Sequence, residues 1–439
     1  MFKLRMFLIG FAILFSSSLA LSAGLELPVN GTARTKGSGG AGLATINDSS
    51  SILINPAGLA YVEGTQLQGG FGALFATVEY TPPGLPKENN DFKLIPLPNG
   101  GFATDKFAPF YLGFFSYPAF GKMNEFDGPS LFQTMGATTA DQVRVASVYR
   151  AKLLVAEGAP AIAVKLSDDL ALGFALRFAW VYLERDSHIL LVPGTESART
   201  DEEYHGFYQS WRLGAQWHPT TDDWLNNLHV GLVFRMLAQT DVHGIFRVRN
   251  FIGPLPSAAF SPWEVEADTL LVDIPLNVGL GFTYDIAPEW RAMVDTFYTN
   301  WNNTNDIRFL YQQPLFGSLI DSVTRLAMKD SFKIHTGTEF DMNDWLTLRG
   351  GYTFDMRAVG DLALNRVIYD GDTHVFAVGS GLYFKNPPLV GDLFKQIDLD
   401  LAFEFGFGER FTANNGANLQ PGYYDIQGYN MEFLFTAHM

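Results

Sequence analysis

The chain of 439 residues contains no cysteine and comparatively few charged residues. Without cysteine it can form neither a disulfide-stapled scaffold nor a thiolate-ligated zinc or iron–sulfur site. Charged residues make up 17% of the sequence and aromatic residues 14%, which excludes a disordered chain, because disorder needs many charges and few aromatics. The net charge of −16 argues against a nucleic-acid partner, since such a protein needs a basic face.

Long hydrophobic runs and enzyme motifs are also missing. Beyond residue 23, no apolar run reaches the roughly 18 residues that a membrane-spanning helix needs. Neither H-E-x-x-H nor G-x-S-x-G occurs, which argues against a zinc protease or a hydrolase. Residues 37–42 fit G-x-G-x-x-G, but no strand precedes them, so a dinucleotide site is not expected. We therefore predict no enzymatic activity, no cofactor and no bound metal.

The first 23 residues have the pattern of a secretory signal peptide. Lys3 and Arg5 precede an apolar stretch at residues 6–15, and small residues follow near Ala20 and Ala23. An uncleaved N-terminal anchor is the alternative. We expect the mature chain to leave the cytoplasm.

The strongest pattern in the remaining sequence has a period of two. Residues 396–408 read QIDLDLAFEFGFG, which places only Ile, Leu and Phe on one face of a strand and acidic or small residues on the other. The same alternation occurs at residues 170–182, 228–236 and 276–284. A soluble sandwich could contain such a strand. However, strands this long, with aromatic residues near several ends, are typical of a transmembrane β-barrel, which must close because lipid cannot satisfy an open edge.

Counting these segments predicts an all-β fold, an antiparallel barrel of about fourteen strands, an even number as such barrels require. Tight turns alternate with long connections, as expected for turns on one side of a membrane and loops on the other. The predicted strands cover residues 66–80, 95–103, 107–118, 153–166, 169–185, 205–218, 227–242, 268–286, 289–303, 330–341, 344–355, 372–385, 396–408 and 424–438. We place the barrel at residues 65–439 and a separate N-terminal segment at residues 24–64.

The segment at residues 24–64 is not a strand and carries recognisable motifs. It contains the glycine-rich residues 37–42, an Asn47-Asp48 step, and Asn55-Pro56-Ala57 followed by Gly58-Leu59. With the later strands at residues 345–355 and 374–383, it resembles the N-terminal plug, or hatch, and the barrel of FadL-type outer-membrane transporters for long-chain fatty acids and other hydrophobic compounds. The Asn-Pro-Ala motif also resembles PorV-like secretion-associated barrels.

The FadL-type resemblance implies a monomeric barrel in the outer membrane of a Gram-negative-type bacterium, with outer-membrane lipid around it. Such a barrel takes up its hydrophobic small-molecule or fatty acid ligand passively. External loops capture the ligand, the lumen binds it, and after hatch movement it leaves through a lateral opening in the wall. A structural or secretion-accessory barrel that docks partner proteins is the alternative function.

In the family, the lateral opening arises at an inward kink of the third strand. Here the third predicted strand contains Pro109, and proline belongs at edges, bulges or kinks because it cannot donate to the ladder. We therefore predict that Pro109 marks the kink. The alternative is that Pro109 simply starts the strand after a turn at residues 105–106.

Strand phase directs six cations into the lumen, namely Arg177, Arg212, Arg235, Arg291, Lys333 and Arg349. Because arginine binds carboxylates bidentately, we predict that Arg177, Arg235 and Arg349 contact the ligand. The alternative is that such cations pair with inward acids, which a polar lumen also contains. Leu25, Leu27 and Val29 form an apolar head on the hatch, which either covers the ligand's tail or packs against the wall.

Overall fold

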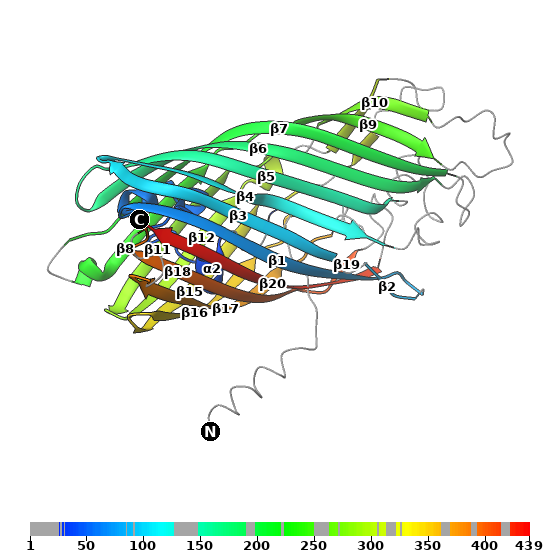
Figure 1. Ribbon diagram of the computed structural model, residues 1–439. Helices are drawn as coiled ribbons and strands as arrows, with labels where there is room; N and C mark the ends of the chain where they lie inside the picture. The colour runs from blue at the N-terminus through cyan, green and yellow to red at the C-terminus, as the bar shows by residue number, and fades with distance from the viewer. Residues whose placement is uncertain are drawn as a thin grey trace.

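The fold is described from a computed structural model (Figure 1). It describes residues 26, 29, 31–84, 86–90, 93–126, 148–189, 198–220, 224–249, 263–270, 273–304, 307–312, 322–324, 327–360, 369–387, 393–413 and 422–439. The predicted signal peptide, Leu25 and Leu27 lie outside these residues.

Within the described residues, fourteen antiparallel strands close into a barrel, as the sequence predicts. They are β1 Thr65–Thr81, β3 Lys93–Phe107, β4 Phe110–Glu125, β5 Val148–Lys165, β6 Leu170–Ile189, β7 Ala198–Trp217, β8 Leu228–Arg235, β11 Asn277–Ala287, β12 Trp290–Thr299, β15 Ser331–Asn343, β16 Leu346–Asp355, β17 Thr373–Lys385, β18 Gln396–Gly408 and β20 Gly422–His438. Each pairs with the next in this order, and β20 returns to β1 with sixteen residue pairs that close the ring.

Shorter strands extend the wall at the end with the long connections. They are β2 Glu88–Asn89, β9 Asp241–Arg249, β10 Trp263–Leu270, β13 Ile307–Tyr311, β14 Ser322–Thr324 and β19 Phe411–Ala413. The predicted strands 227–242 and 268–286 are each divided in two here, into β8 with β9 and β10 with β11. Pro275 lies in the second interruption and has no N–H to donate, which accounts for the break in the ladder there.

The two faces of the wall meet different surroundings. In β18, Leu401 is exposed on the outside, whereas Asp400 and Glu404 are buried on the inside. An apolar core would not tolerate these carboxylates without partners, but a polar lumen supplies them. The alternation therefore encodes a lipid-facing outside and a lumen, as predicted. No helix in the described part of the chain has the length and apolarity needed to cross a membrane.

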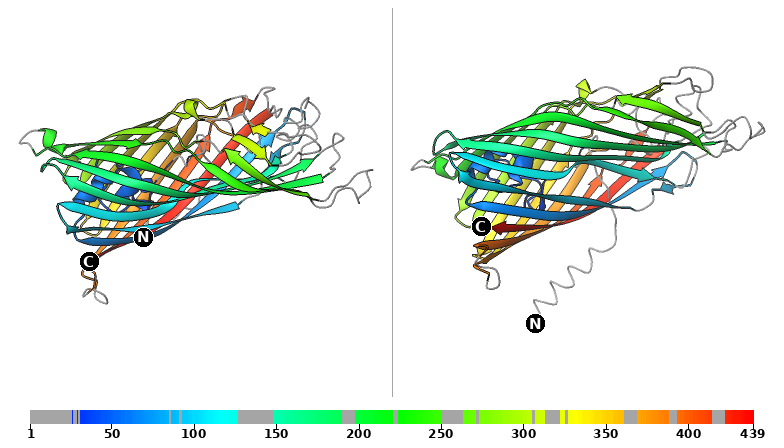
Figure 2. Two further views of the ribbon diagram at one scale, coloured as in Figure 1. Left: turned by 90° about the horizontal axis from the view of Figure 1, so that it is seen from above. Right: turned by 45° about the horizontal axis from the view of Figure 1, so that its top comes forward.

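The hatch lies inside the barrel, at the end where the C-terminus lies (Figures 1 and 2). It contains α2 Ala33–Gly37, α3 Ser51–Ile54 and the 3-10 helix η1 Pro56–Tyr61. Gly39 and Gly40 between them have positive φ angles of 63° and 81°, a conformation that glycine adopts at no steric cost. The remaining helical turns are η2 Trp224–Asn227 and η4 Trp301–Asn303.

Candidate ligand-binding site in the barrel lumen

The Asn-Pro-Ala motif fixes the hatch to the wall. The Asn55 side-chain amide donates to the carbonyl of Leu43 at 2.9 Å and to that of Ala215 in β7 at 3.0 Å, while its oxygen accepts from the Ala57 amide. Asn55 thereby caps η1, in which Pro56 takes the first position. Gly173 of β6 permits this contact, because a Cβ atom there would lie 2.2 Å from the Pro56 carbonyl carbon.

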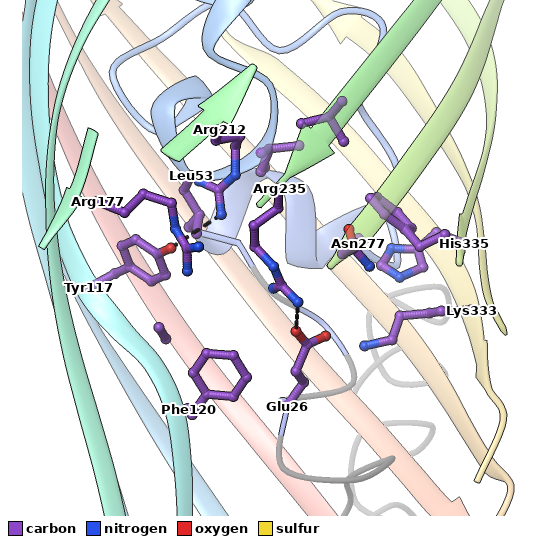
Figure 3. A pocket seen from close by; sticks show the side chains of 15 residues that line it. Glu26, Leu53, Tyr117, Phe120, Arg177, Arg212, Arg235, Asn277, Lys333 and His335 are labelled. Atoms are coloured by element: carbon purple, nitrogen blue, oxygen red, sulfur yellow. Dashed lines mark hydrogen bonds and ion pairs between the residues drawn. The ribbon is translucent and has the colours of Figure 1, made fainter. Parts of the chain in front are cut away.

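Beside the hatch, a cavity of about 60 Å³ lies in the lumen (Figure 3). Its charged lining consists of one hatch carboxylate, Glu26, and the barrel cations Arg177, Arg212, Arg235 and Lys333. A cavity of this size holds water molecules but not a drug-sized ligand, which needs roughly 300–1,000 Å³. A ligand of that size would therefore need the lining side chains or the hatch to move.

Arg177 is held by a buried network. Its guanidinium donates to both oxygens of Glu157 in β5, at 2.9 and 2.6 Å, and the hydroxyls of Tyr117 and Tyr208 donate to the same carboxylate. Arg177 is only 1% exposed, and among the described residues its Nη1 atom has no hydrogen-bond partner. The pair with Glu157 fixes the side chain, while Nη1 leaves one buried donor without an acceptor.

Arg235 has a different kind of partner. It forms an ion pair with Glu26, which comes from the hatch and not from the barrel (Figure 3). Burial disfavours the charged form of the Glu26 carboxylate, but the positive charges of Arg235 and Lys333 outweigh burial and lower its pKa. Glu26 also forms an isolated antiparallel bridge with Phe120 of β4. The first described residue of the hatch is therefore held by one guanidinium and one strand edge.

Arg349 does not line this cavity. It donates to Glu339 at 2.8 Å, to Asp400 at 2.6 Å and to the Tyr383 hydroxyl at 2.8 Å. These partners engage all three guanidinium nitrogens, and the Arg349 side chain lies next to Gly37 at the end of α2. For Arg349 the geometry therefore favours the alternative in which a lumen cation pairs with inward acids. Arg177 and Arg235, by contrast, are brought together at one cavity.

The barrel wall opens between β3 and β4. Their ladder contains six pairs and ends at Gly100 and Ser116, although β3 continues back to Lys93 and β4 onward to Glu125. Among the described residues, the remaining parts of these two strands pair with β1 and β5 and not with each other. Three prolines lie in the unpaired parts, Pro96, Pro98 and Pro118. Their missing N–H groups suit a strand edge that has no ladder partner.

The irregularity of the third barrel strand lies away from Pro109. Pro109 occupies the turn between β3 and β4, so the prediction of a kink at this residue is corrected. The register of β4 instead shifts between Pro118 and Phe120, where Ala119 is the extra residue of a bulge. Pro109 precedes the strand because its fixed φ suits a turn, which was the alternative interpretation.

A second, smaller cavity lies at this opening. Leu97 and Asn99 line it from β3, Tyr117 and Pro118 from β4, and Val29 from the hatch. Val29 is 4% exposed and so packs at the opening, not beside the arginines. Tyr117 lines both cavities, so the arginine cluster and the opening in the wall lie next to each other at this residue.

The sequence matches a known protein family over almost its whole length. Residues 13–428 match the model of the family described as outer membrane protein transport protein (OMPP1/FadL/TodX). The chain belongs to this family. It is accordingly an outer-membrane β-barrel of the Gram-negative type, and the family consists of transport proteins for hydrophobic compounds. A comparison with curated proteins finds no match.

Solved structures of family members have the same fold. A FadL homologue of Pseudomonas aeruginosa is 16% identical with a TM-score of 0.77, and the alignment covers 95% of this chain and 100% of the homologue. The toluene transporter TbuX of Ralstonia pickettii is 15% identical with a TM-score of 0.68, covering 94% and 99%. The toluene transporter TodX of Pseudomonas putida is 14% identical with a TM-score of 0.70, covering 95% and 99%.

Sequence reasoning missed Glu26, Glu157 and Tyr117. Glu26 had a signal, because it is the one charged residue between the predicted cleavage site and Arg34. It lies between Leu25 and Leu27, which were predicted only to form an apolar head on the hatch. Glu157 and Tyr117 gave no such signal, since their importance comes from meeting Arg177 on the inner face of the consecutive strands β4, β5 and β6.

Proposed function

We propose that this barrel takes up hydrophobic molecules, long-chain fatty acids among them, as a monomer and without an energy source. The external loops capture the ligand, the arginine-lined cavity binds its head, and the ligand leaves through the opening between β3 and β4 into the membrane. The loops assigned to capture lie largely outside the described residues. The family match does not favour the alternative of a secretion-accessory barrel.

The observation that carries this proposal is the position of Tyr117. This residue lines both the cavity with the arginines and the cavity at the wall opening. A ligand that enters the first cavity is therefore close to the region where β3 and β4 share no ladder. The hatch lies inside the barrel at the end with the C-terminus, and its Asn55 is hydrogen-bonded to β7, which supports a lateral exit over a straight one.

Uptake by whole cells tests the proposal. Cells that lack their own transporter of this kind are compared with and without the full chain, using radiolabelled hexadecanoate, 1-hexadecanol and a small sugar. We expect faster uptake of both amphiphiles and unchanged entry of the sugar. Equal uptake of the amphiphiles with and without the chain would contradict transport, and faster entry of the sugar would indicate an open pore instead.

A further inference from the structure

The cations around the lumen cavity are only partly neutralised by the barrel itself. Glu157 pairs with Arg177 at 2.6 Å, and Asp355 pairs with Lys333 at 3.0 Å. Arg212 donates to the Ile52 carbonyl and, within the described residues, has no carboxylate at ion-pair distance. In that same part of the chain, the ion-pair partner of Arg235 is Glu26 of the hatch alone.

The hatch thus supplies a charge that the barrel lacks. Glu26 is 5% exposed and Arg235 is 7% exposed, so both charges are largely removed from bulk water. Even with Glu26 in place, the Nε atom of Arg235 and the Nη1 atom of Arg177 are buried donors that find no partner in the part of the chain that the structure describes. An isolated buried guanidinium is costly, so removal of Glu26 leaves a site that demands another anion.

We propose that Glu26 is a built-in competitor for the head group of the ligand. An amphiphile that carries a carboxylate replaces the Glu26 carboxylate on Arg235, so Glu26 sets both the affinity and the head-group preference of the site. A neutral hydrocarbon or alcohol cannot make this exchange, because it brings no charge to Arg235. This inference rests on the proposed uptake function and names the ligand class as carboxylate amphiphiles.

The exchange is coupled to the opening in the wall. The backbone of Glu26 bridges Phe120, which lies directly after the bulge of β4 at the unpaired edge. Arg235 also lies over the Phe120 ring at 5.8 Å. When the Glu26 carboxylate leaves Arg235, the hatch loses the ion pair that holds its backbone against this strand edge. Head-group binding therefore weakens the cover over the opening through which the tail departs.

Equilibrium binding to the full-length protein in amphipol tests the exchange. The probes are dodecanoate and 1-dodecanol, which share a tail and differ in charge. Glu26→Gln keeps the size of the side chain but removes its charge. We expect it to tighten dodecanoate binding about tenfold and to change dodecanol binding less than about twofold, since a tenfold change corresponds to a modest change in binding free energy.

Substitutions of Arg235 test the other partner of the ion pair. Arg235→Met should weaken dodecanoate binding about tenfold or more and leave dodecanol binding nearly unchanged. In the double variant, Glu26→Gln should no longer improve dodecanoate binding, because the contested guanidinium is gone. Arg235→Lys retains the charge and should keep part of the preference, which guards against a general folding defect of the Met variant.

A matched control lies elsewhere on the hatch. Asp48 pairs with Arg34 at 3.0 Å and does not line the cavity. Asp48→Asn should loosen the hatch while leaving the ratio of dodecanoate to dodecanol affinity unchanged. If Glu26→Gln alters both ligands equally, or alters neither, the competitor role is wrong although cells still take up both amphiphiles. If no variant binds either ligand, the proposed function fails as well.

Discussion

Two seams of the barrel, each the boundary between two neighbouring strands, differ in how completely their strands are paired. Where β1 meets β20, sixteen residue pairs run along almost the whole length of both strands. Where β3 meets β4, strands of 15 and 16 residues share only six pairs. Both seams lie in a wall that must exclude lipid from unpaired backbone groups. At the second seam fewer backbone N–H groups lack a partner, because its prolines have no N–H. The hatch also lies behind this seam.

The largest effect is expected from closing the open seam. Asn99→Cys with Tyr117→Cys places the only two thiols of the protein on either side of the opening, since the native chain has no cysteine. A short bifunctional thiol reagent should then reduce amphiphile uptake at least about tenfold, because the exit is held shut. Radiolabelled uptake before and after linking measures the effect.

The unlinked form of this double variant provides the baseline for the two substitutions themselves. Ala73→Cys with Met431→Cys, a facing pair in the β1–β20 seam, is the matched control. Linking that pair should leave uptake unchanged. Unchanged uptake after linking Cys residues at 99 and 117 would remove the lateral exit.

A second prediction concerns Arg349 in β16, away from the opening between β3 and β4. Arg349→Ala leaves Glu339 and Asp400 without their shared cation and should lower stability by about 3–5 kcal/mol, as is usual when a buried ion pair loses one partner. Thermal or denaturant unfolding measures this loss. The ratio of dodecanoate to dodecanol affinity should stay at the wild-type value, in contrast to Arg235→Met. A changed ratio would bring Arg349 back as a ligand contact.

A third prediction uses the contact between the wall and the hatch. Gly173→Ala places a methyl group 2.2 Å from the Pro56 carbonyl carbon, and overpacking of this kind costs about 1–3 kcal/mol. The hatch should become easier to cleave by an added protease, while the barrel stays folded. Gly69→Ala in β1 is the control, since an added Cβ there meets no atom within 4 Å. Equal protease sensitivity of the two variants would contradict the anchoring role of this contact.

The smallest effect is expected from restoring a backbone N–H group at the unpaired edge of β4. Pro118→Val restores an N–H next to the bulge but does not move β3 toward β4. We expect slower hydrogen exchange at residues 117–125 and a reduction in uptake of about two- to threefold, since one donor contributes only about 1 kcal/mol. Hydrogen–deuterium exchange with mass spectrometry checks the first result. Faster exchange would show that Pro118 stabilises this edge.

Sequence reasoning predicted the wall better than the site. The strands over residues 66–80 and 396–408 agree closely with β1 and β18, because alternation between lipid and lumen acts on each residue separately. Pro109 was assigned to a kink because proline disfavours ladders in general. The one-dimensional pattern could not distinguish a turn from a bulge ten residues away at Ala119.

The arginines illustrate the same limit. Strand phase correctly directed Arg177, Arg235 and Arg349 into the barrel, where all three are buried. Phase does not reveal which carboxylate faces each one. Arg349 meets Glu339 from the neighbouring strand β15 and Asp400 from β18, two strands away. Arg235 meets Glu26 from a segment about two hundred residues earlier in the chain.

The sequence by itself determined that this protein forms a closed transmembrane barrel, because residue-by-residue hydrophobicity records which surroundings each side chain meets. Only the tertiary structure decided where the wall opens and which cations lack a barrel partner. Those features depend on ring closure and strand register, which bring residues 26, 120 and 235 together although no local pattern connects them.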